Sequence, residues 1–139
     1  MQGETRFSER AGHLIELARS ATEDGAKLVV AVGGDGTLNE VVNGIAGQDV
    51  DLATIPLGTG MDFVRSHGIP TRFDDAVRVA LGETTRTIDA GRVRFRTWAG
   101  ADAERYYANV GSVGMSGAVA QRANAMSKAL GGRVTFFYA

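Results

Sequence analysis

Two glycine-rich segments contain the residue types that could perform chemistry on a phosphate compound. The first is Gly33-Gly34-Asp35-Gly36-Thr37, and the second is Gly58-Thr59-Gly60 with Asp62 two residues further on. Glycines leave backbone N–H groups open to a phosphate, and the start of a following helix adds partial positive charge. Each segment also supplies a hydroxyl and a carboxylate. The pair therefore predicts a site for a nucleotide with its magnesium ion; the alternative is two tight turns capped by Thr and Asp.

Asp35 is the informative residue of the first segment. A carboxylate beside phosphate groups repels them unless a cation lies between. Asp35 could therefore hold Mg²⁺, directly or through water, or accept a proton from an attacking hydroxyl, and a turn-capping role is the alternative. Asp62 has the same two interpretations, because an aspartate at a helix start also balances the helix dipole. Neither segment matches the Walker A or the G-x-G-x-x-G pattern.

Alternating strands and helices are predicted to position these segments. Apolar runs at residues 28–32 and 51–55 lack polar alternation, which is typical of parallel strands covered on both faces. Each run leads into one glycine segment, so both segments are expected at the ligand-binding edge of a parallel sheet. The spacing of apolar residues predicts helices over 38–45 and 73–81, a short helix around 63–64, and an N-terminal helix that Ser8 caps and Gly25 ends.

The alternation of strands and helices stops near residue 88. Residues 92–97 alternate charged and apolar side chains, which predicts a half-exposed strand. A turn over 100–104 and a partner strand over 105–110 are expected to follow. Further along the chain, the pattern predicts a helix over 119–130 and a strand over 134–138.

Composition narrows the class of protein. The 139 residues are enough for one domain, or for one domain and the start of another, and a hydrophobic fraction of 44% supports a packed core. The net charge of −1 gives no electrostatic reason to expect nucleic acid as a partner. The absence of cysteine excludes disulfides and thiolate metal sites. No apolar run approaches the roughly 20 residues of a transmembrane helix, and the N-terminus lacks the apolar region of a signal peptide.

Residues 33–44, Gly-Gly-Asp-Gly-Thr-Leu-Asn-Glu-Val-Val-Asn-Gly, resemble the signature of the diacylglycerol kinase catalytic domain. Residues 56–65, Pro-Leu-Gly-Thr-Gly-Met-Asp-Phe-Val-Arg, are similar to its second motif and follow at the family's spacing. NAD kinases and phosphofructokinase relatives share the first motif, but the two motifs together favour the lipid kinase family. More weakly, residues 8–13 resemble the family's nucleotide-contacting segment, and residues 88–91 resemble the entry into its second domain. Residues 107–114 are similar to the next strand and turn of that domain.

The resemblance implies an α/β fold: a doubly wound, mostly parallel nucleotide-binding domain over 1–87, incomplete here, and the beginning of a β-rich domain over 88–139. It implies transfer of the γ-phosphoryl group of ATP to the hydroxyl of diacylglycerol or a related lipid, with ATP and Mg²⁺ as cofactors. Asp35 is the expected catalytic residue, and no residue is assigned to a metal site. The expected nucleotide-binding residues are Ser8, Gly33, Gly34, Asp35, Gly36, Thr37, Leu38, Asn39, Gly58, Thr59, Gly60 and Asp62.

Such an enzyme is expected in the cytoplasm, with transient peripheral contact at the inner face of the membrane. No nucleic-acid partner is expected, and the sequence leaves open whether the protein forms a homodimer. Met61 stands where the family usually has asparagine. The family's Asn-Pro-x-Ser-Gly loop and its Leu-Asp-Gly-Glu segment, which carries the candidate base, are expected outside this chain, so we expect the chain alone to be inactive or very weakly active. Two alternatives stay open: an NAD-kinase-like kinase of a soluble acceptor, and a non-catalytic nucleotide-binding module.

Overall fold

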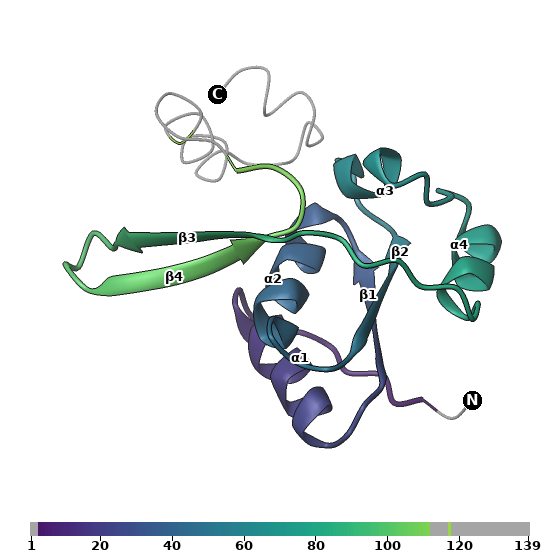
Figure 1. Ribbon diagram of the computed structural model, residues 1–139, viewed down its shortest axis with the longest axis horizontal. Helices are drawn as coiled ribbons and strands as arrows, with labels where there is room; N and C mark the ends of the chain where they lie inside the picture. Colours follow the sequence, from purple (N-terminus) through teal and green to yellow (C-terminus); the bar gives the residue numbers. More distant parts are fainter. Residues whose placement is uncertain (1–2, 112–116, 118–139) are drawn as a thin grey trace.

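The computed structural model describes residues 3–111 and residue 117, so the expected helix over 119–130 and strand over 134–138 lie outside the described residues. Its elements are α1 (His13–Glu23), β1 (Leu28–Gly33), α2 (Asp35–Ile45), β2 (Asp51–Pro56), α3 (Asp62–Ser66), α4 (Phe73–Ala80), β3 (Gly91–Arg96) and β4 (Asp102–Tyr107). Figure 1 shows α1 and α2 on one side of β1 and β2, α4 on the other side, and the β3–β4 hairpin projecting away. Within the described residues, no helix is long and apolar enough to cross a membrane.

Strands β1 and β2 pair in parallel, and α2 is the crossover between them. Their register runs from Leu28 opposite Asp51 to Gly33 opposite Pro56. Both strands therefore end side by side, and the two glycine segments leave the sheet at the same edge. The parallel α/β arrangement predicted from the sequence is confirmed in this part of the chain.

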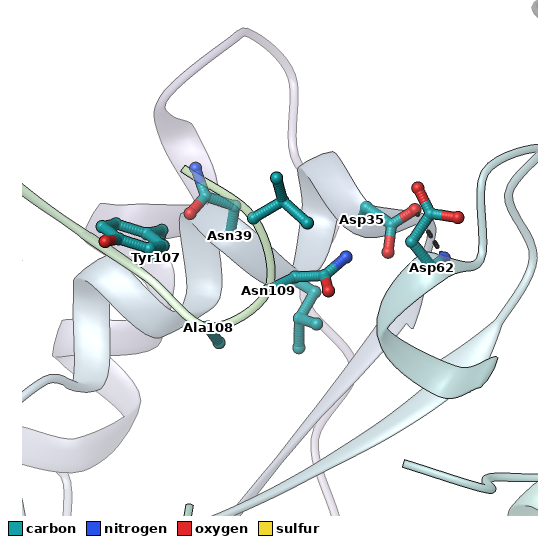
Figure 2. Close-up of a pocket in the computed structure, with 8 residues that line it drawn as sticks. Asp35, Asn39, Asp62, Tyr107, Ala108 and Asn109 are labelled. Carbon is teal, nitrogen blue, oxygen red and sulfur yellow. Dashed lines mark hydrogen bonds between the residues drawn. The ribbon is translucent and has the colours of Figure 1, made fainter. Parts of the chain in front are cut away.

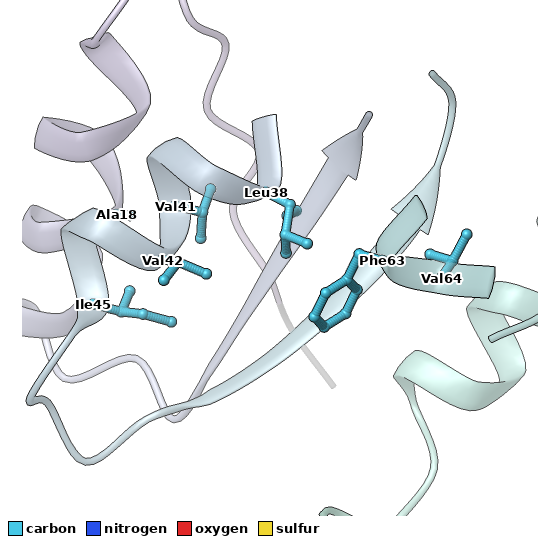
Figure 3. Close-up of a cluster of buried hydrophobic side chains, with 8 residues drawn as sticks. Ala18, Leu38, Val41, Val42, Ile45, Phe63 and Val64 are labelled. Atoms are coloured by element: carbon cyan, nitrogen blue, oxygen red, sulfur yellow. The ribbon is translucent and has the colours of Figure 1, made fainter. Parts of the chain in front are cut away.

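One apolar cluster holds α1, α2, β1 and α3 together. Its buried residues are Ala18, Ala31, Leu38, Val41, Val42, Ile45, Phe63 and Val64, most of them drawn in Figure 3. Four of them come from α2, at the helical spacing that the sequence shows. Because α2 begins directly after the first glycine segment, this packing fixes where that segment lies.

Gly44 sets the distance between α1 and α2. A Cβ atom added at Gly44 would lie 2.6 Å from the backbone oxygen of Ile15 and 2.7 Å from the Cβ of Ala18. Gly44→Ala gains up to about 1 kcal/mol of helix propensity, but overpacking costs about 1–3 kcal/mol. We therefore expect a net loss of about 1 kcal/mol in the free energy of unfolding, measured by urea denaturation. Gly36→Ala is the matched control, because a Cβ there meets nothing within 4 Å; an equal response of the two variants would contradict the steric explanation.

The prediction that both strands are covered on both faces is correct for β2 and wrong for β1. In β2 the adjacent residues Thr54 and Ile55, which point to opposite faces, are both buried. In β1, Ala31 faces the core, whereas Val30 and Val32 point the other way and are 36% and 50% exposed. The reason is that, among the described elements, the helices next to β1 pack on the Ala31 side only.

Three predicted helix details also differ from the structure. Ser8 lies in an irregular segment and does not cap α1, which begins at His13. The acceptors at that helix start come from Glu40 of α2, whose carboxylate receives the N–H groups of Gly12 (3.0 Å) and Leu14 (3.2 Å). Helix α2 begins at Asp35, earlier than predicted. In α4, the end residues Phe73 and Leu81 are mostly exposed, because the alanines in between make the packed face.

Strands β3 and β4 form a separate antiparallel sheet. The return strand begins at Asp102, three residues before the predicted start, because Asp102 and Glu104 lie opposite Arg96 and Arg94 and pair with them at 3.3 and 2.7 Å. The hydrogen bond from Arg94 and the charge of Arg92 lower the pKa of Glu104 from its ordinary value. The division into two domains at residue 87 stays a prediction.

Candidate nucleotide site at the glycine loops

The two glycine segments touch each other through their backbones. A Cβ atom added at Gly58 would lie 2.4 Å from the Cα of Gly34, and one added at Gly34 would lie 3.1 Å from the Cα of Gly58. The N–H of Leu57 also donates to the carbonyl oxygen of Gly33 at 2.9 Å. Both glycines are therefore required by the contact between the loops, and the two segments form one unit at the sheet edge.

Alanine substitutions at Gly58 and Gly34 should lower the free energy of unfolding by different amounts. Gly58→Ala is expected to lower the free energy of unfolding by about 2 kcal/mol, because the added methyl group meets backbone that cannot rotate away. Gly34→Ala should cost less, since its Cβ has more room. Thermal denaturation of both variants beside the wild type measures the order. Equal stability of all three proteins would show that the loops separate at no cost.

Asp35 joins the first loop to the second. It is the first residue of α2, and its two carboxylate oxygens accept the backbone N–H groups of Asp62 (3.1 Å) and Phe63 (3.0 Å) at the start of α3. Gly60 permits this approach, because a Cβ there would lie 2.4 Å from the Oδ2 atom of Asp35. The capping alternative for Asp35 is thus realised in the structure. Each carboxylate oxygen keeps a second lone pair that can face a ligand.

The second loop ends in a strained residue and an ion pair. Met61 precedes α3 with φ 59° and ψ 30°, and it is the one non-glycine residue with positive φ among those described. Asparagine occurs several-fold more often than other side chains in this left-handed conformation. The backbone shape therefore explains why asparagine suits this position without any contact to a ligand. Asp62 pairs with Arg65, which also donates to the carbonyl oxygen of Gly60.

A pocket of about 220 Å³ opens beside these carboxylates. It is lined by Asp35, Leu38, Asn39, Asp62, Tyr107, Ala108, Asn109 and Val110. Figure 2 shows the two aspartates at one end, Tyr107 at the other, and Asn109 between them. Ligand pockets usually measure about 300–1,000 Å³, so this volume suits a phosphate group with its cation better than a whole nucleotide.

Asn43 of α2 holds in place residues 107–110, which form the pocket wall opposite the aspartates. Its side-chain Nδ2 donates to the carbonyl oxygen of Tyr106 at 2.8 Å, and its Oδ1 accepts the N–H of Tyr106 at 2.9 Å. These two hydrogen bonds fix Tyr106 against α2, and residues 107–110 follow it directly in the chain. Asn43 and residues 107–110 were not among the predicted site residues, although both lie in segments that resemble the family.

The structure brings four predicted site residues together in the pocket: Asp35, Leu38, Asn39 and Asp62. The residues around the start of α2 lie next to the pocket, at the end of β1 and in the first turn of the helix: Gly33, Gly34, Gly36 and Thr37. No side chain caps the N-terminus of this helix. Gly58, Thr59 and Gly60 lie in the second loop, and the side chain of Thr37 packs against Gly33. Ser8 does not line the pocket; it is an exposed residue before α1.

Comparison with known proteins places the chain in a family. A family profile described as the diacylglycerol kinase catalytic domain matches residues 1–93. A diacylglycerol kinase of Staphylococcus haemolyticus is 33% identical over 132 residues, which are 94% of this chain and 37% of the relative. A diacylglycerol kinase of Mycobacterium tuberculosis is 33% identical over 111 residues, 79% of this chain and 35% of the relative.

A solved structure agrees with this assignment. It is a crystal structure from Bacillus anthracis that carries the provisional name diacylglycerol kinase, with 30% identity and a TM-score of 0.55 over 61% of this chain and 32% of its own. The parallel pair with two glycine loops thus defines an α/β domain of the type found in lipid kinases. The chain belongs to the diacylglycerol kinase catalytic-domain family. It spans about a third of the length of the curated relatives that it matches.

Proposed function

We propose that this chain is the nucleotide-binding part of a lipid kinase that transfers the γ-phosphoryl group of ATP to the hydroxyl of diacylglycerol or a related lipid. The observation that carries the proposal is the meeting of two glycine loops at one sheet edge. That meeting sets Asp35 and Asp62 beside the open N-terminus of α2. Family membership supports a kinase, and the names of the relatives favour a lipid acceptor.

The first turn of α2 supplies the phosphate-binding groups. The N–H groups of Asp35, Gly36 and Thr37 have no partner within the helix, and the N-cap residue Gly34 has no side chain to satisfy them. These N–H groups form the positive end of the helix dipole, which favours an anion. Gly36 keeps this turn open, because it presents no side chain to an approaching phosphate.

The carboxylates fit a magnesium ion held in the manner usual for nucleotide enzymes. Among the described residues no three acidic or histidine side chains converge in a way that could hold a metal ion. Mg²⁺ commonly takes only one or two carboxylates and fills its other positions with water and phosphate oxygens. Asp35 and Asp62 are the residues that would hold it, and the ion would neutralise charge that develops on the transferred phosphoryl group. Asp35 would in addition fix the start of α3 throughout the reaction.

We propose that the acceptor lipid binds beside the pocket wall at residues 107–110. Asn109 lies between the aspartates and Tyr107, so the acceptor hydroxyl would enter across this wall. The proposed enzyme acts from the cytoplasm at the inner face of the membrane. Because the base expected from the family resemblance lies outside this chain, we propose that the 139 residues bind ATP without appreciable turnover.

One observation favours the non-catalytic module as a second candidate. Both oxygens of Asp35 already accept backbone N–H groups, which is a sufficient structural reason for an aspartate at this position. In that case ATP would bind to the full-length protein, and no acceptor would be phosphorylated.

Radiolabelled ATP tests the proposal directly. A full-length protein that carries this sequence is incubated with [γ-³²P]ATP, Mg²⁺ and either diacylglycerol in vesicles or NAD⁺ in solution. Label transferred to diacylglycerol supports the lipid kinase, label on NAD⁺ supports the soluble-acceptor kinase, and ATP binding without transfer supports the module. Calorimetry with the 139-residue chain and ATP tests the binding part, and no heat of binding would refute it.

A further inference from the structure

The β3–β4 hairpin ends in a rigid turn. The N–H of Thr97 donates to the carbonyl oxygen of Ala101 at 2.8 Å, and the N–H of Gly100 donates to the carbonyl oxygen of Thr97 at 2.8 Å. The N–H of Ala101 also donates to the hydroxyl of Thr97 at 3.1 Å. Gly100 takes the positive φ of 82° that closes such a three-residue loop. We call residues 96–102 the hairpin tip.

Trp98 stands at the apex of this turn and is completely exposed, at 101% of its reference area. Figure 1 shows that the hairpin projects away from the α/β part of the chain, so the tip is presented outward. Burial of a tryptophan is worth more than burial of almost any other side chain. A rigid turn also loses little conformational entropy when its side chain is buried. Both facts make the tip suitable for burying Trp98 against a binding partner.

Arginines are spread along both strands of the hairpin. The hairpin carries Arg92, Arg94, Arg96 and Arg105, against only two acids, Asp102 and Glu104. Arg94 and Arg96 pair with these acids, Arg92 lies 3.9 Å from Glu104, and the side chain of Arg105 donates to the carbonyl oxygen of Glu104. The hairpin is therefore locally positive although the whole chain has a net charge of −1. At physiological salt, charges act over about 8 Å, so a partner senses the hairpin rather than the whole molecule.

An anionic bilayer matches this combination. Tryptophan is enriched at the membrane interface, where its ring reaches the acyl boundary and its N–H stays hydrated. Basic residues close to an anionic leaflet add attraction, and one aromatic anchor with a few such charges gives weak, reversible binding. Each six-residue strand is about 20 Å long. A hairpin lying along the membrane would thus keep both Trp98 and the pocket wall at residues 107–110 near the lipid surface.

We propose that the hairpin tip is a membrane anchor that inserts Trp98 into the headgroup region of an anionic lipid bilayer, with the hairpin arginines above the lipid phosphates. The anchor rests on the proposed lipid kinase function, because that function requires the protein to reach a membrane. Its test needs no turnover, so failure of the anchor and failure of the kinase proposal are distinguishable.

Trp98 is the only tryptophan in the chain, so its fluorescence reports the tip directly. The 139-residue chain is titrated with vesicles of phosphatidylcholine, with and without phosphatidylglycerol. With phosphatidylglycerol present, the emission maximum should move to shorter wavelength, and brominated phosphatidylcholine should quench it. Vesicles of phosphatidylcholine alone should give a much smaller change. High salt should reverse most of the binding.

Co-sedimentation with phosphatidylglycerol vesicles tests the residues. Trp98→Ala should lower the vesicle affinity about tenfold. Phe7→Ala, which removes another exposed aromatic ring, should leave it unchanged. Asp102→Asn removes a negative charge whose side chain is 84% exposed, and it should raise the affinity about fivefold. An unchanged thermal denaturation curve of Asp102→Asn would show that the gain of binding does not come from misfolding.

Several results would overturn the anchor: an emission maximum that vesicles do not move, an effect of Phe7→Ala equal to that of Trp98→Ala, or no response to Asp102→Asn. An emission already shifted in vesicle-free buffer would also overturn it, because Trp98 would then be covered by protein. If instead the anchor binds as expected and the radiolabel assay finds no lipid product, the kinase proposal alone fails.

Discussion

Asp35→Asn is expected to lower the turnover of the proposed full-length lipid kinase by about 10²- to 10⁴-fold, with less than about a tenfold change in the Kd for ATP. The substitution keeps the shape of the side chain and removes its negative charge. Without that charge the site loses a ligand for Mg²⁺ and a group that could accept a proton. The phosphate-binding N–H groups of α2 stay in place. Transfer of ³²P to diacylglycerol and calorimetry with ATP measure the two quantities.

The structural role of Asp35 must be separated from its proposed chemistry. Asparagine keeps one of the two oxygens that cap α3 but turns an amide NH₂ group toward the other N–H, so its stability cost should be comparable to that of Asp35→Ala, about 1–2 kcal/mol. A turnover loss in Asp35→Asn far larger than this loss of stability explains would therefore report chemistry. Asp49→Asn, at an exposed aspartate between α2 and β2, is the matched control and should keep full turnover. Wild-type turnover in Asp35→Asn would leave the residue with its capping role alone and would remove it from the proposed mechanism.

Asn43→Ala is expected to lower the free energy of unfolding by about 3 kcal/mol. The change removes two hydrogen bonds and leaves the N–H and the carbonyl oxygen of Tyr106 without their partners. Each unsatisfied, partly buried backbone group costs about 1–3 kcal/mol. Because the same hydrogen bonds position residues 107–110, ATP-dependent lipid phosphorylation should fall as well. Hydrogen exchange should show faster exchange in β4, while β1 and β2 stay protected.

A second asparagine variant and a surface variant make this test specific. Asn43→Asp keeps the Oδ1 acceptor for the N–H of Tyr106 but replaces the donor with an oxygen that faces the Tyr106 carbonyl, so its loss should be comparable to that of alanine. Gln48→Ala removes an amide from an exposed loop position and should change the stability by less than about 0.5 kcal/mol. Uniform loss of protection across both sheets in Asn43→Ala would mean that Asn43 supports the whole fold and does not specifically hold the hairpin.

Local sequence signals were sufficient for the elements and for the position of the loops. The apolar runs that end in Gly33 and Pro56 predicted two neighbouring parallel strands, and the structure has them in register. The apolar repeat of α2 predicted its buried face, because helical periodicity is visible within two or three turns. The hairpin was also predicted, although its turn was placed about three residues too late, because the glycine, small and acidic residues of 100–104 are typical of a turn, whereas β4 begins at Asp102.

Contacts between residues that are distant in sequence could not be predicted. Asp35 meets the N–H of Asp62 27 positions away, and Asn43 meets Tyr106 63 positions away. Nothing in either neighbourhood shows these partners. The Ser8 cap failed for the same reason: α1 takes its acceptor from Glu40 on another helix. Exposure of Val30 and Val32 was missed because an apolar run shows what a strand can bury and not which elements cover it.

The contact between Gly34 and Gly58 restricts how this sequence can change over time. Most packing faults can be repaired by trimming a neighbouring side chain, but here each neighbour has none to trim. A mutation at one position therefore has no compensating mutation at the other. We expect the two glycines to be inherited together wherever the loops stay in contact, and to be lost together in descendants that have abandoned the site.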